Sequence, residues 1–239
     1  MLQIFDTGIQ SAADNMLLDA KLLDQLKEPT LHLYQWARPS ATFGYFIRPE
    51  KHLDLQKVAQ RHLDLARRPT GGGIVFHIWD LAFSFLLPST HPAFSLGTLD
   101  NYRFVNNIVL DVMKNFFTLK DPVELIAQNA PSLGPDCQNF CMAKPTQYDV
   151  VYKGLKIAGA AQRKRKQGYL HQGTISLAYP HTDLLNDVLL SKKDVLEAMK
   201  SYTFAPLGRL WEPHTLQKTR IELQKLLADK FQRALTSTS

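Results

Sequence analysis

Segments of strand length follow one another along the chain with only short connections between them, and this pattern constrains the fold most. The apolar segments that fit strands are residues 31–36, 41–46, 63–67, 73–76, 82–87, 148–152, 155–162 and 173–177. Antiparallel neighbours can be joined by a short turn, whereas parallel strands need a long crossover that usually contains a helix. The pattern therefore predicts an α+β fold with a mixed, largely antiparallel sheet.

Helical periodicity is strongest near the N-terminus and in the second half of the chain. Ser11 with Asp14 three positions later is a capping-box pattern, and it opens an apolar helical face that ends before Pro29. Apolar residues at helical spacing predict further helices over residues 55–62, 101–117, 192–202 and 215–235. These helices would flank the sheet. Because no linker or repeat interrupts the 239 residues, we expect a single domain over residues 1–239.

The composition excludes several classes of protein. Apolar residues make up 45% of the chain and charged residues 21%, which is typical of a globular protein rather than a disordered one. No apolar run reaches the roughly 20 residues that span a bilayer, and the first residues do not resemble a signal peptide. Two cysteines, Cys137 and Cys141, are too few for a disulfide framework, and no Cys/His spacing is typical of zinc. We therefore expect a soluble, cytoplasmic protein without a metal site.

The glycine-rich segment Arg67-Arg68-Pro69-Thr70-Gly71-Gly72-Gly73-Ile74-Val75-Phe76-His77 is the most informative motif. Glycines lack Cβ atoms, so the backbone can approach a ligand closely and point successive N–H groups at a carbonyl or phosphate. The segment is neither a Walker loop nor a dinucleotide fingerprint, because no Gly-Lys-Ser/Thr follows and the glycines are consecutive. Taken alone, the three glycines are explained more simply by a tight turn between two strands.

Neighbouring motifs favour a ligand site. The glycine-rich segment resembles the signature Arg-Arg-x-x-Gly-Gly-x-x-Val-x-His of the lipoate-protein ligase A family and its octanoyltransferase relatives, in the biotin/lipoate ligase superfamily. Three further segments resemble the family, and with the glycine-rich segment they stand along the chain in the family's order. They are Leu33 to Phe46, which precedes the glycines, and Lys156 to Gln162 and His171-Gln172-Gly173-Thr174, which come after them. The resemblance covers roughly residues 3–200. It implies a biotin/lipoate ligase-like catalytic domain that attaches an octanoyl or lipoyl group to one lysine of a lipoyl domain.

The resemblance also implies the residues of the site. Lys156 resembles the family's essential lysine, whose ammonium can hold the acyl carbonyl and stabilise an oxyanion. The substrate-binding residues that it implies are Arg68, Gly71, Gly72, Gly73, His77, Gly159, Ala160, His171, Gly173 and Thr174. An eight-carbon chain needs an apolar tunnel. Candidates for its wall, each of which also fits an ordinary core position, are Phe43, Phe46, Val75 and Phe85.

Cys141 distinguishes two reaction types within the family. The segment from Cys141 to Asp149 resembles Cys-x-x-x-Pro-Ser-x-Tyr-Glu of the cysteine-dependent octanoyltransferases, whereas ligases usually carry Arg-Asn-Asp and no cysteine there. A thiolate attacks a thioester and leaves readily when an amine attacks it in turn. Lys144, Lys156 or His171 would raise the thiolate fraction if one of them lay nearby. The resemblance therefore predicts Cys141 as the nucleophile, and Cys137 as an ordinary buried cysteine.

Two further features favour a transferase. The segment after His77 lacks the longer His-Asp-Leu-Gly-Asn spacing of ligases, and the chain continues only to Ser239, which is short for the ligases' accessory domain. A transferase of this kind needs no cofactor, whereas a ligase would use ATP and magnesium. Three departures from the family pattern, at Gly73, Ile78 and Gln172, keep the ligase as the alternative.

A basic run, residues 163–166, follows the lysine-containing strand and is expected to cap a turn. Lipoyl domains and acyl carrier proteins tend to be acidic, so this run would steer them to the site, although a solvated loop explains it equally well. The expected partners are lipoyl domains of 2-oxoacid dehydrogenase complexes or the glycine-cleavage H protein, with acyl carrier protein as a candidate donor. A nucleic-acid-binding protein and a non-catalytic acyl-binding module are the rival classes. A net charge of only +6, without aromatic residues among the basic ones, disfavours nucleic acid.

Overall fold

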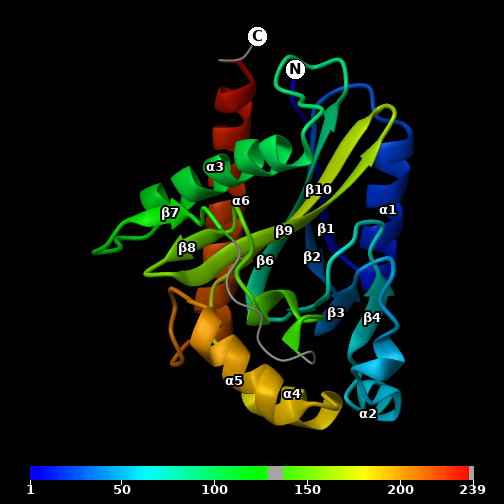
Figure 1. The fold of residues 1–239 in the computed structure, drawn as a ribbon, viewed down its shortest axis with the longest axis vertical. Helices are drawn as coiled ribbons and strands as arrows, with labels where there is room; N and C mark the ends of the chain where they lie inside the picture. The colour runs from blue at the N-terminus through cyan, green and yellow to red at the C-terminus, as the bar shows by residue number, and fades with distance from the viewer. Residues whose placement is uncertain (129–136, 237–239) are drawn as a thin grey trace.

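The strands form a seven-stranded sheet and a smaller three-stranded sheet (Figure 1). The computed structural model describes residues 1–128 and 137–236. In the larger sheet, only the first two strands in space run parallel, and the remaining neighbours are antiparallel. Their order in space is β1 (Gln3–Gln10), β2 (Thr30–Trp36), β6 (Asp80–Pro88), β10 (Gly168–Ser176), β9 (Leu155–Arg165), β8 (Val150–Tyr152) and β7 (Val123–Leu125). The predicted α+β class and the mixed, largely antiparallel sheet are confirmed.

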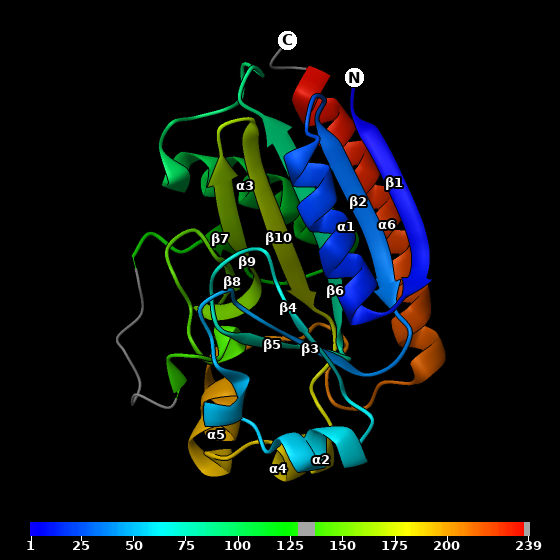
Figure 2. The same cartoon turned by 90° about the vertical axis from the view of Figure 1, so that its right-hand side faces the viewer.

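The smaller sheet carries the glycine-rich segment. Its strands in spatial order are β4 (Asp64–Arg67), β3 (Ser40–Phe43) and β5 (Ile74–His77). β3 and β4 run parallel, so the chain between them makes a crossover through η1 (Pro49–Lys51) and α2 (Leu55–Gln60). The three glycines lie between β4 and β5, as predicted. Figure 2 shows this sheet on the same side of the larger sheet as the N-terminal helix.

Helices cover both faces of the larger sheet (Figure 2). α1 (Ala12–Asp24) lies on one face, and α3 (Thr98–Phe116) and α6 (Pro213–Thr236) lie on the other. The sequence of strand β6 is almost continuously apolar because the strand is buried on both faces. Phe85 packs on Phe231 of α6 with ring centroids 4.5 Å apart, whereas Ala82 and Leu86 pack in clusters with α1 residues. A strand buried on both faces needs apolar residues at successive positions rather than at alternate ones.

Two short helices close the lower end of the molecule in Figure 1, α4 (Thr182–Val188) and α5 (Lys192–Tyr202). α5 packs against the short turn η3 (Cys141–Ala143), which in turn contacts β5. Through these contacts the chain brings a turn from its second half against the strand that follows the glycines. Among the described helices, none has the length and apolar character needed to cross a bilayer.

The structure contains elements that the sequence pattern does not reveal: β1, β7 and α4. β1 is an edge strand whose residues are exposed or only half-buried, so it shows no apolar alternation. The expectation that residues 163–166 follow the strand and cap a turn is wrong for the first three. β9 continues through Arg165, which pairs with Gly168 of β10. Backbone pairing does not require apolar side chains where a hairpin extends into solvent.

Candidate active site

Cys141 lies against the glycine-rich segment. The backbone N–H of Gly73 donates a hydrogen bond to the Cys141 Sγ at 3.1 Å, and Ile74 N–H donates to the carbonyl of Asn139 at 2.6 Å. A Cβ atom on Gly73 would stand only 2.2 Å from that same carbonyl oxygen, so no larger residue fits at this position without a shift of the backbone. The close approach of the two segments therefore places a sulfur atom beside a backbone N–H group.

Arg68 provides a buried cation beside the thiol. Its guanidinium donates to the carbonyl and hydroxyl of Thr42, at 3.0 and 2.7 Å, and to the carbonyls of Gly71 and Gly73, at 3.1 and 2.7 Å. Burial lowers the pKa of the Arg68 guanidinium, and the neighbouring Cys141 opposes that shift. Two of these hydrogen bonds hold the glycine-rich segment and two anchor the guanidinium to β3, while the positive charge faces the sulfur.

Lys156 lies on the other side of Cys141 and is held by a carboxylate. Its Nζ lies 2.8 Å from Oδ2 of Asp149 and donates to the backbone carbonyl of Cys141 at 3.0 Å. Both side chains of the ion pair are only 4% exposed, and Thr146 donates two further hydrogen bonds to the Asp149 carboxylate. A Cβ atom on Gly159 would lie 2.3 Å from Cε of Lys156, so this glycine makes room for the ion pair.

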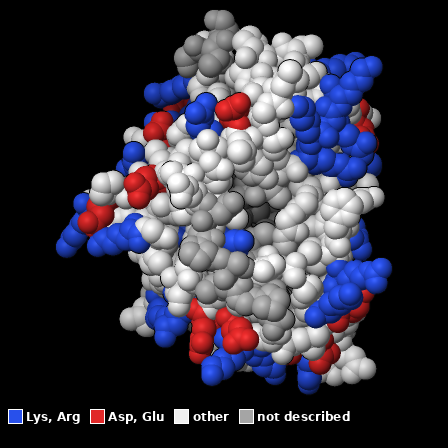
Figure 3. Space-filling view, viewed as in Figure 1, with Lys and Arg blue, Asp and Glu red and all other residues white. Residues whose placement is uncertain are grey.

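Cys141, Arg68 and Lys156 line one hollow in the protein, which we call the central cavity. It lies among α1, β2, β3, β5, β6, β9, β10 and η3, and its empty space of about 420 Å³ includes open solvent. Its lining consists of Met16, Tyr34, Thr42, Arg68, Val75, His77, Ala82, Cys141, Lys156, Gly159, Ala160, Ala161, Gln172, Gly173 and Thr174. The exposed part of its wall is mostly apolar, as an acyl chain requires. Figure 3 shows a hollow on this face of the molecule, in the region of β9 and β10.

A chain of buried hydrogen bonds ties the wall of the central cavity together. Nε2 of His77 lies 2.7 Å from the hydroxyl of Thr42, and its Nδ1 lies 2.7 Å from Oδ2 of Asp80. Thr174 donates to the same carboxylate oxygen at 2.6 Å. These contacts connect β3, β5, β6 and β10. His77 is therefore fixed by partners on both ring nitrogens and serves as a rigid part of the wall.

His171 lies outside the central cavity. Successive residues of a strand point to opposite faces, so Gln172 and Thr174 line the cavity while the His171 ring lies beside Phe83 and Tyr102. Its Nδ1 accepts a hydrogen bond from the side-chain amide N–H of Gln162 at 2.8 Å, and its Nε2 has no partner among the described residues. Burial lowers the pKa of His171 to about 3, so the ring is neutral near pH 7.

The structure brings most of the sequence-predicted site residues together. Those that line the central cavity are Cys141, Lys156, Arg68, His77, Gly159, Ala160, Gly173 and Thr174. The three glycines 71–73 form the segment beside the sulfur without being part of the lining. Of the four apolar candidates for the tunnel wall, only Val75 lines it. Phe85 is in the core against α6, and Phe46 is 88% exposed.

Several site residues escape analysis of the sequence alone. Asp149, the partner of Lys156, lies within the cysteine segment but no local pattern indicates that it faces a lysine seven positions later. Met16 and Tyr34 line the cavity from α1 and β2; Tyr34 lies in a segment that resembles the family, but the sequence assigns neither residue a role in the site. Gln172 had a usable signal, because strand alternation places it on the same face as Thr174.

Comparisons with known proteins agree with this geometry. The model of the lipoyl protein ligase A/B catalytic domain matches residues 11–205. The chain is 32% identical over 194 residues to octanoyltransferase LipM of Geobacillus kaustophilus, covering 79% of this chain and 68% of that protein. A lipoate-protein ligase A bound with ATP has a similar fold, with a TM-score of 0.65, 20% identity and coverage of 99% and 92% of the two chains.

A second structure of similar fold is a bipartite lipoate protein ligase from Thermoplasma acidophilum, solved in a study of that ligase and its E2 lipoyl domain. Its TM-score is 0.63 at 19% identity, with 99% of this chain and 92% of that chain covered. The family match spans most of the chain, includes the glycine-rich segment and ends beyond the strand that carries Thr174. With a cysteine and a buried lysine on the wall of one mostly apolar cavity, the chain belongs to the lipoyl protein ligase A/B catalytic domain family and is an acyltransferase of that family.

Proposed function

We propose that the protein transfers an octanoyl group to a lysine of a lipoyl domain through a thioester on Cys141. The observation that carries this proposal is that Cys141 and Lys156 line the same mostly apolar cavity. The similarity to octanoyltransferase LipM supports the identity of the acyl group. The study of the Thermoplasma ligase with its E2 lipoyl domain supports the class of acceptor.

In the first step, the octanoyl chain lies in the central cavity and the Cys141 thiolate attacks the thioester carbonyl of the donor. The donor thiol leaves and takes up the proton that the Cys141 thiol has lost. Negative charge develops on the carbonyl oxygen, and fixed donors close to Sγ stabilise it without reorganisation. Two donors are at hand: the N–H of Gly73, and the Lys156 ammonium, whose contacts with Asp149 and the Cys141 carbonyl leave one of its three N–H groups for a ligand.

In the second step, the amine of the acceptor lysine attacks the acyl group on Cys141 and forms an amide, and the cysteine leaves as a thiolate. A thiolate beside the Arg68 cation is a good leaving group. The acceptors that we propose are lipoyl domains of 2-oxoacid dehydrogenase complexes or the glycine-cleavage H protein. Neither step of the transfer needs a cofactor, whereas the alternative ligase reaction would consume ATP with magnesium.

The basic end of the β9–β10 hairpin, residues 163–166, is placed to attract an acidic partner. Figure 3 shows lysines and arginines gathered over this end of the hairpin, and Lys164, Arg165 and Lys166 are exposed. Complementary charge speeds association, and salt weakens the effect. We propose that this end guides the lipoyl domain or acyl carrier protein toward the central cavity.

Mass spectrometry of the intact protein after incubation with an octanoyl thioester tests the proposal. We expect the wild-type protein and a Cys137→Ala variant to gain the mass of one octanoyl group, and Cys141→Ala to gain none. Cys137 is the matched control because it is buried, with its Sγ 3.4 Å from the carbonyl of Asp194. ATP-dependent lipoylation that persists in Cys141→Ala would establish the ligase instead. The absence of any acylation, with or without ATP, would indicate a non-catalytic module.

A further inference from the structure

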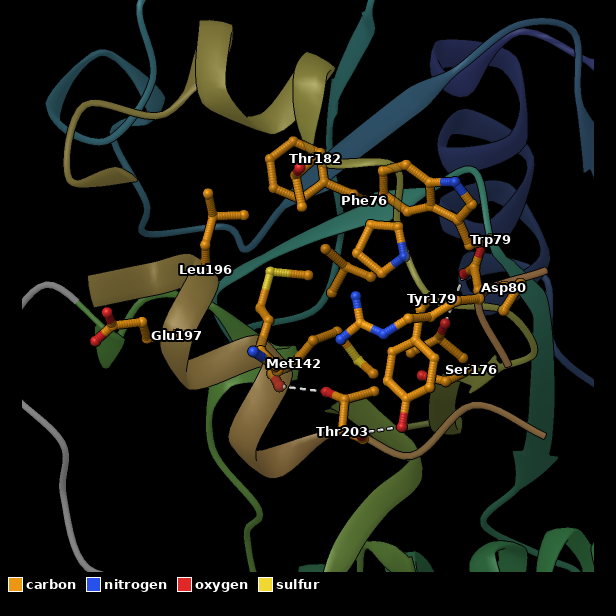
Figure 4. Close-up of a pocket in the computed structure, with 17 residues that line it drawn as sticks. Phe76, Trp79, Asp80, Met142, Ser176, Tyr179, Thr182, Leu196, Glu197 and Thr203 are labelled. Carbon is orange, nitrogen blue, oxygen red and sulfur yellow. Dashed lines mark hydrogen bonds between the residues drawn. The ribbon is translucent and has the colours of Figure 1, made fainter. Parts of the chain in front are cut away.

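A second cavity lies beside the η3 turn and is lined by Met142 of that turn together with residues of α5, including Leu196 (Figure 4). It contains about 890 Å³ of empty space, part of which is open to solvent. Met142, the residue after Cys141, lines this cavity, whereas Cys141 itself lines the central one. Val75 and Thr174 belong to the walls of both. The two cavities are therefore neighbours that share two wall residues, and the turn η3 contributes one residue to each.

The interior of the second cavity is apolar with a few polar groups. Phe76, Trp79 and Met199 are buried and supply apolar walls. Asp80 also lines the cavity, and its Oδ1 is buried without a hydrogen-bond partner among the described residues. A buried carboxylate oxygen without a partner costs free energy, and a ligand that brings an N–H group would satisfy it.

Charged side chains stand at the rim. Lys200 and Arg209 are exposed and line the cavity, with Glu197 as the carboxylate beside them. Arg209 is stacked over the ring of Tyr179, with its Cζ 5.3 Å from the ring centroid, so the guanidinium has a defined position at the entrance. The rim therefore offers two cations for a phosphate, while the interior suits a chain of methylenes and amides.

We infer that the second cavity binds the pantetheine arm of the acyl donor. This inference rests on the proposed function. With the acyl chain in the central cavity and its carbonyl at Cys141, the leaving thiol must extend away from that cavity. The second cavity, which is lined by the next residue, Met142, is the neighbouring space that can receive it. The arm alternates methylenes with amide N–H groups, which match the apolar walls and Asp80 Oδ1, and it ends in a phosphate, which matches Lys200 and Arg209.

The reaction balances without another reactant. The C–S bond to the arm breaks, a C–S bond to Cys141 Sγ forms, and the arm departs as a free thiol carrying the former cysteine proton. Both coenzyme A and acyl carrier protein carry this arm with its phosphate, so the cavity would accept either source. The protein surface beyond the rim would then discriminate between them.

The acylation rate of Cys141 with three octanoyl thioesters tests the inference. They are the thioesters of N-acetylcysteamine, which has only the reactive end of the arm, of pantetheine, and of phosphopantetheine. We expect the wild-type protein to react about tenfold faster with the pantetheine thioester than with the short one, because a tenfold gain corresponds to only about 1.4 kcal/mol of extra binding. Equal rates would overturn the inference.

Filling the cavity should remove that advantage. Leu196 of α5 is half-buried and lines the second cavity, so Leu196→Trp is expected to slow the pantetheine thioester about tenfold and change the N-acetylcysteamine rate less than twofold. Leu190→Trp makes the same change at a residue that is 52% exposed and lines neither the central cavity nor the second cavity, and it should change neither rate. Equal slowing of both thioesters by Leu196→Trp would overturn the inference.

Arg209→Ala gives a second variant that does not disturb the interior, because the side chain is exposed. It should slow the phosphopantetheine thioester about threefold to tenfold and leave the pantetheine thioester unchanged. If neither rate changes, the phosphate does not lie at this rim. The octanoyl thioesters of coenzyme A and of acyl carrier protein, measured in the same way, identify the native source, and Leu196→Trp should slow both.

The test separates this inference from the proposed function. Failure of every thioester, including the short one, to acylate Cys141 would contradict the proposed function. Acylation by the short thioester, with no advantage for the arm and no effect of Leu196→Trp, would contradict only the second-cavity inference. Calorimetry on Cys141→Ala with pantetheine and with ATP adds a binding readout, and binding of ATP in place of pantetheine would overturn the inference.

Discussion

The ion pair of Lys156 with Asp149 sets what the ammonium can do. The Asp149 carboxylate, 2.8 Å away, fixes the position of the Lys156 Nζ, so Lys156 can present an N–H donor to an oxyanion without rearrangement. This contact also means that the position of the ammonium depends on a residue that never touches the acyl group in the proposed reaction.

Asp149→Asn is therefore expected to slow acylation of Cys141 at least tenfold and to destabilise the fold by about 3–5 kcal/mol, because one partner of a buried ion pair is left uncompensated. Acylation by mass spectrometry and urea denaturation measure the two effects. Lys153→Met is the matched control on the same hairpin, since it breaks an exposed pair with Asp121. Equal effects of both variants would contradict the role of Asp149.

Arg68 supplies the other cation near the sulfur. Arg68→Met should slow acylation of Cys141 by an octanoyl thioester about tenfold, because the Arg68 guanidinium holds the carbonyls of Gly71 and Gly73, and the N–H of Gly73 contacts the sulfur. The neighbouring Arg67 is exposed and bonds to the carbonyl of Ile47, so Arg67→Met should leave the rate nearly unchanged. An acylation rate in Arg68→Met equal to that of the wild type would show that the site does not depend on this guanidinium.

At the scale of elements, the site is made where three segments meet: the β4–β5 connection, the η3 turn and the start of β9. Each segment is short, and none of them indicates the site by its own sequence. The hydrogen bonds from Gly73 to Cys141 Sγ and from Lys156 to the Cys141 carbonyl join all three. The spacing between these elements therefore matters more to the site than the identity of any loop residue that faces solvent.

The glycines of the β4–β5 connection test this argument. Gly73→Ala should lower stability by about 1–3 kcal/mol, because the new Cβ would stand 2.2 Å from a backbone oxygen that cannot move easily. Gly71→Ala is the matched control, since a Cβ there meets nothing within 4 Å. Thermal denaturation compares the two. A loss of stability in Gly71→Ala as large as in Gly73→Ala would contradict the argument.

At the scale of the whole molecule, His171 links the stability of the core to pH. Its pKa is lowered by burial from 6.5 to about 3, so the unfolded chain takes up a proton below pH 6.5 that the folded protein does not. Stability from this group is therefore complete above pH 6.5 and is lost as the pH falls toward 3. The loss is at most about 1.4 kcal/mol per pH unit.

Urea denaturation of wild type and His171→Gln between pH 7 and pH 4 measures this effect. The free energy of unfolding should fall less steeply with decreasing pH in the variant, because glutamine does not titrate. The other buried histidine pairs, His32 with Asp19 and His77 with Asp80, are the same in both proteins and cancel in the comparison. Parallel pH profiles for the two proteins would show that His171 does not contribute.

The sequence by itself determined the fold class, the order of most strands and helices, and the family. These properties depend on local periodicity and on motifs read along the chain, such as the glycine-rich segment and the cysteine segment. The helix over Lys192–Tyr202 was predicted with its observed bounds, because its apolar stripe is strong and local. β1 escaped because an exposed edge strand has no apolar alternation.

Tertiary structure alone decided which cation faces the sulfur, which carboxylate holds Lys156, and which face of β10 lines the cavity. Arg68 and Cys141 are 73 positions apart (141 − 68), and no local pattern encodes their meeting. His171 and Gln172 differ by one position in the motif, yet the pleat of the strand sends one ring into the core and the other side chain into the cavity. Contacts between segments distant in the chain arise only from packing, because their positions depend on how whole elements fit together.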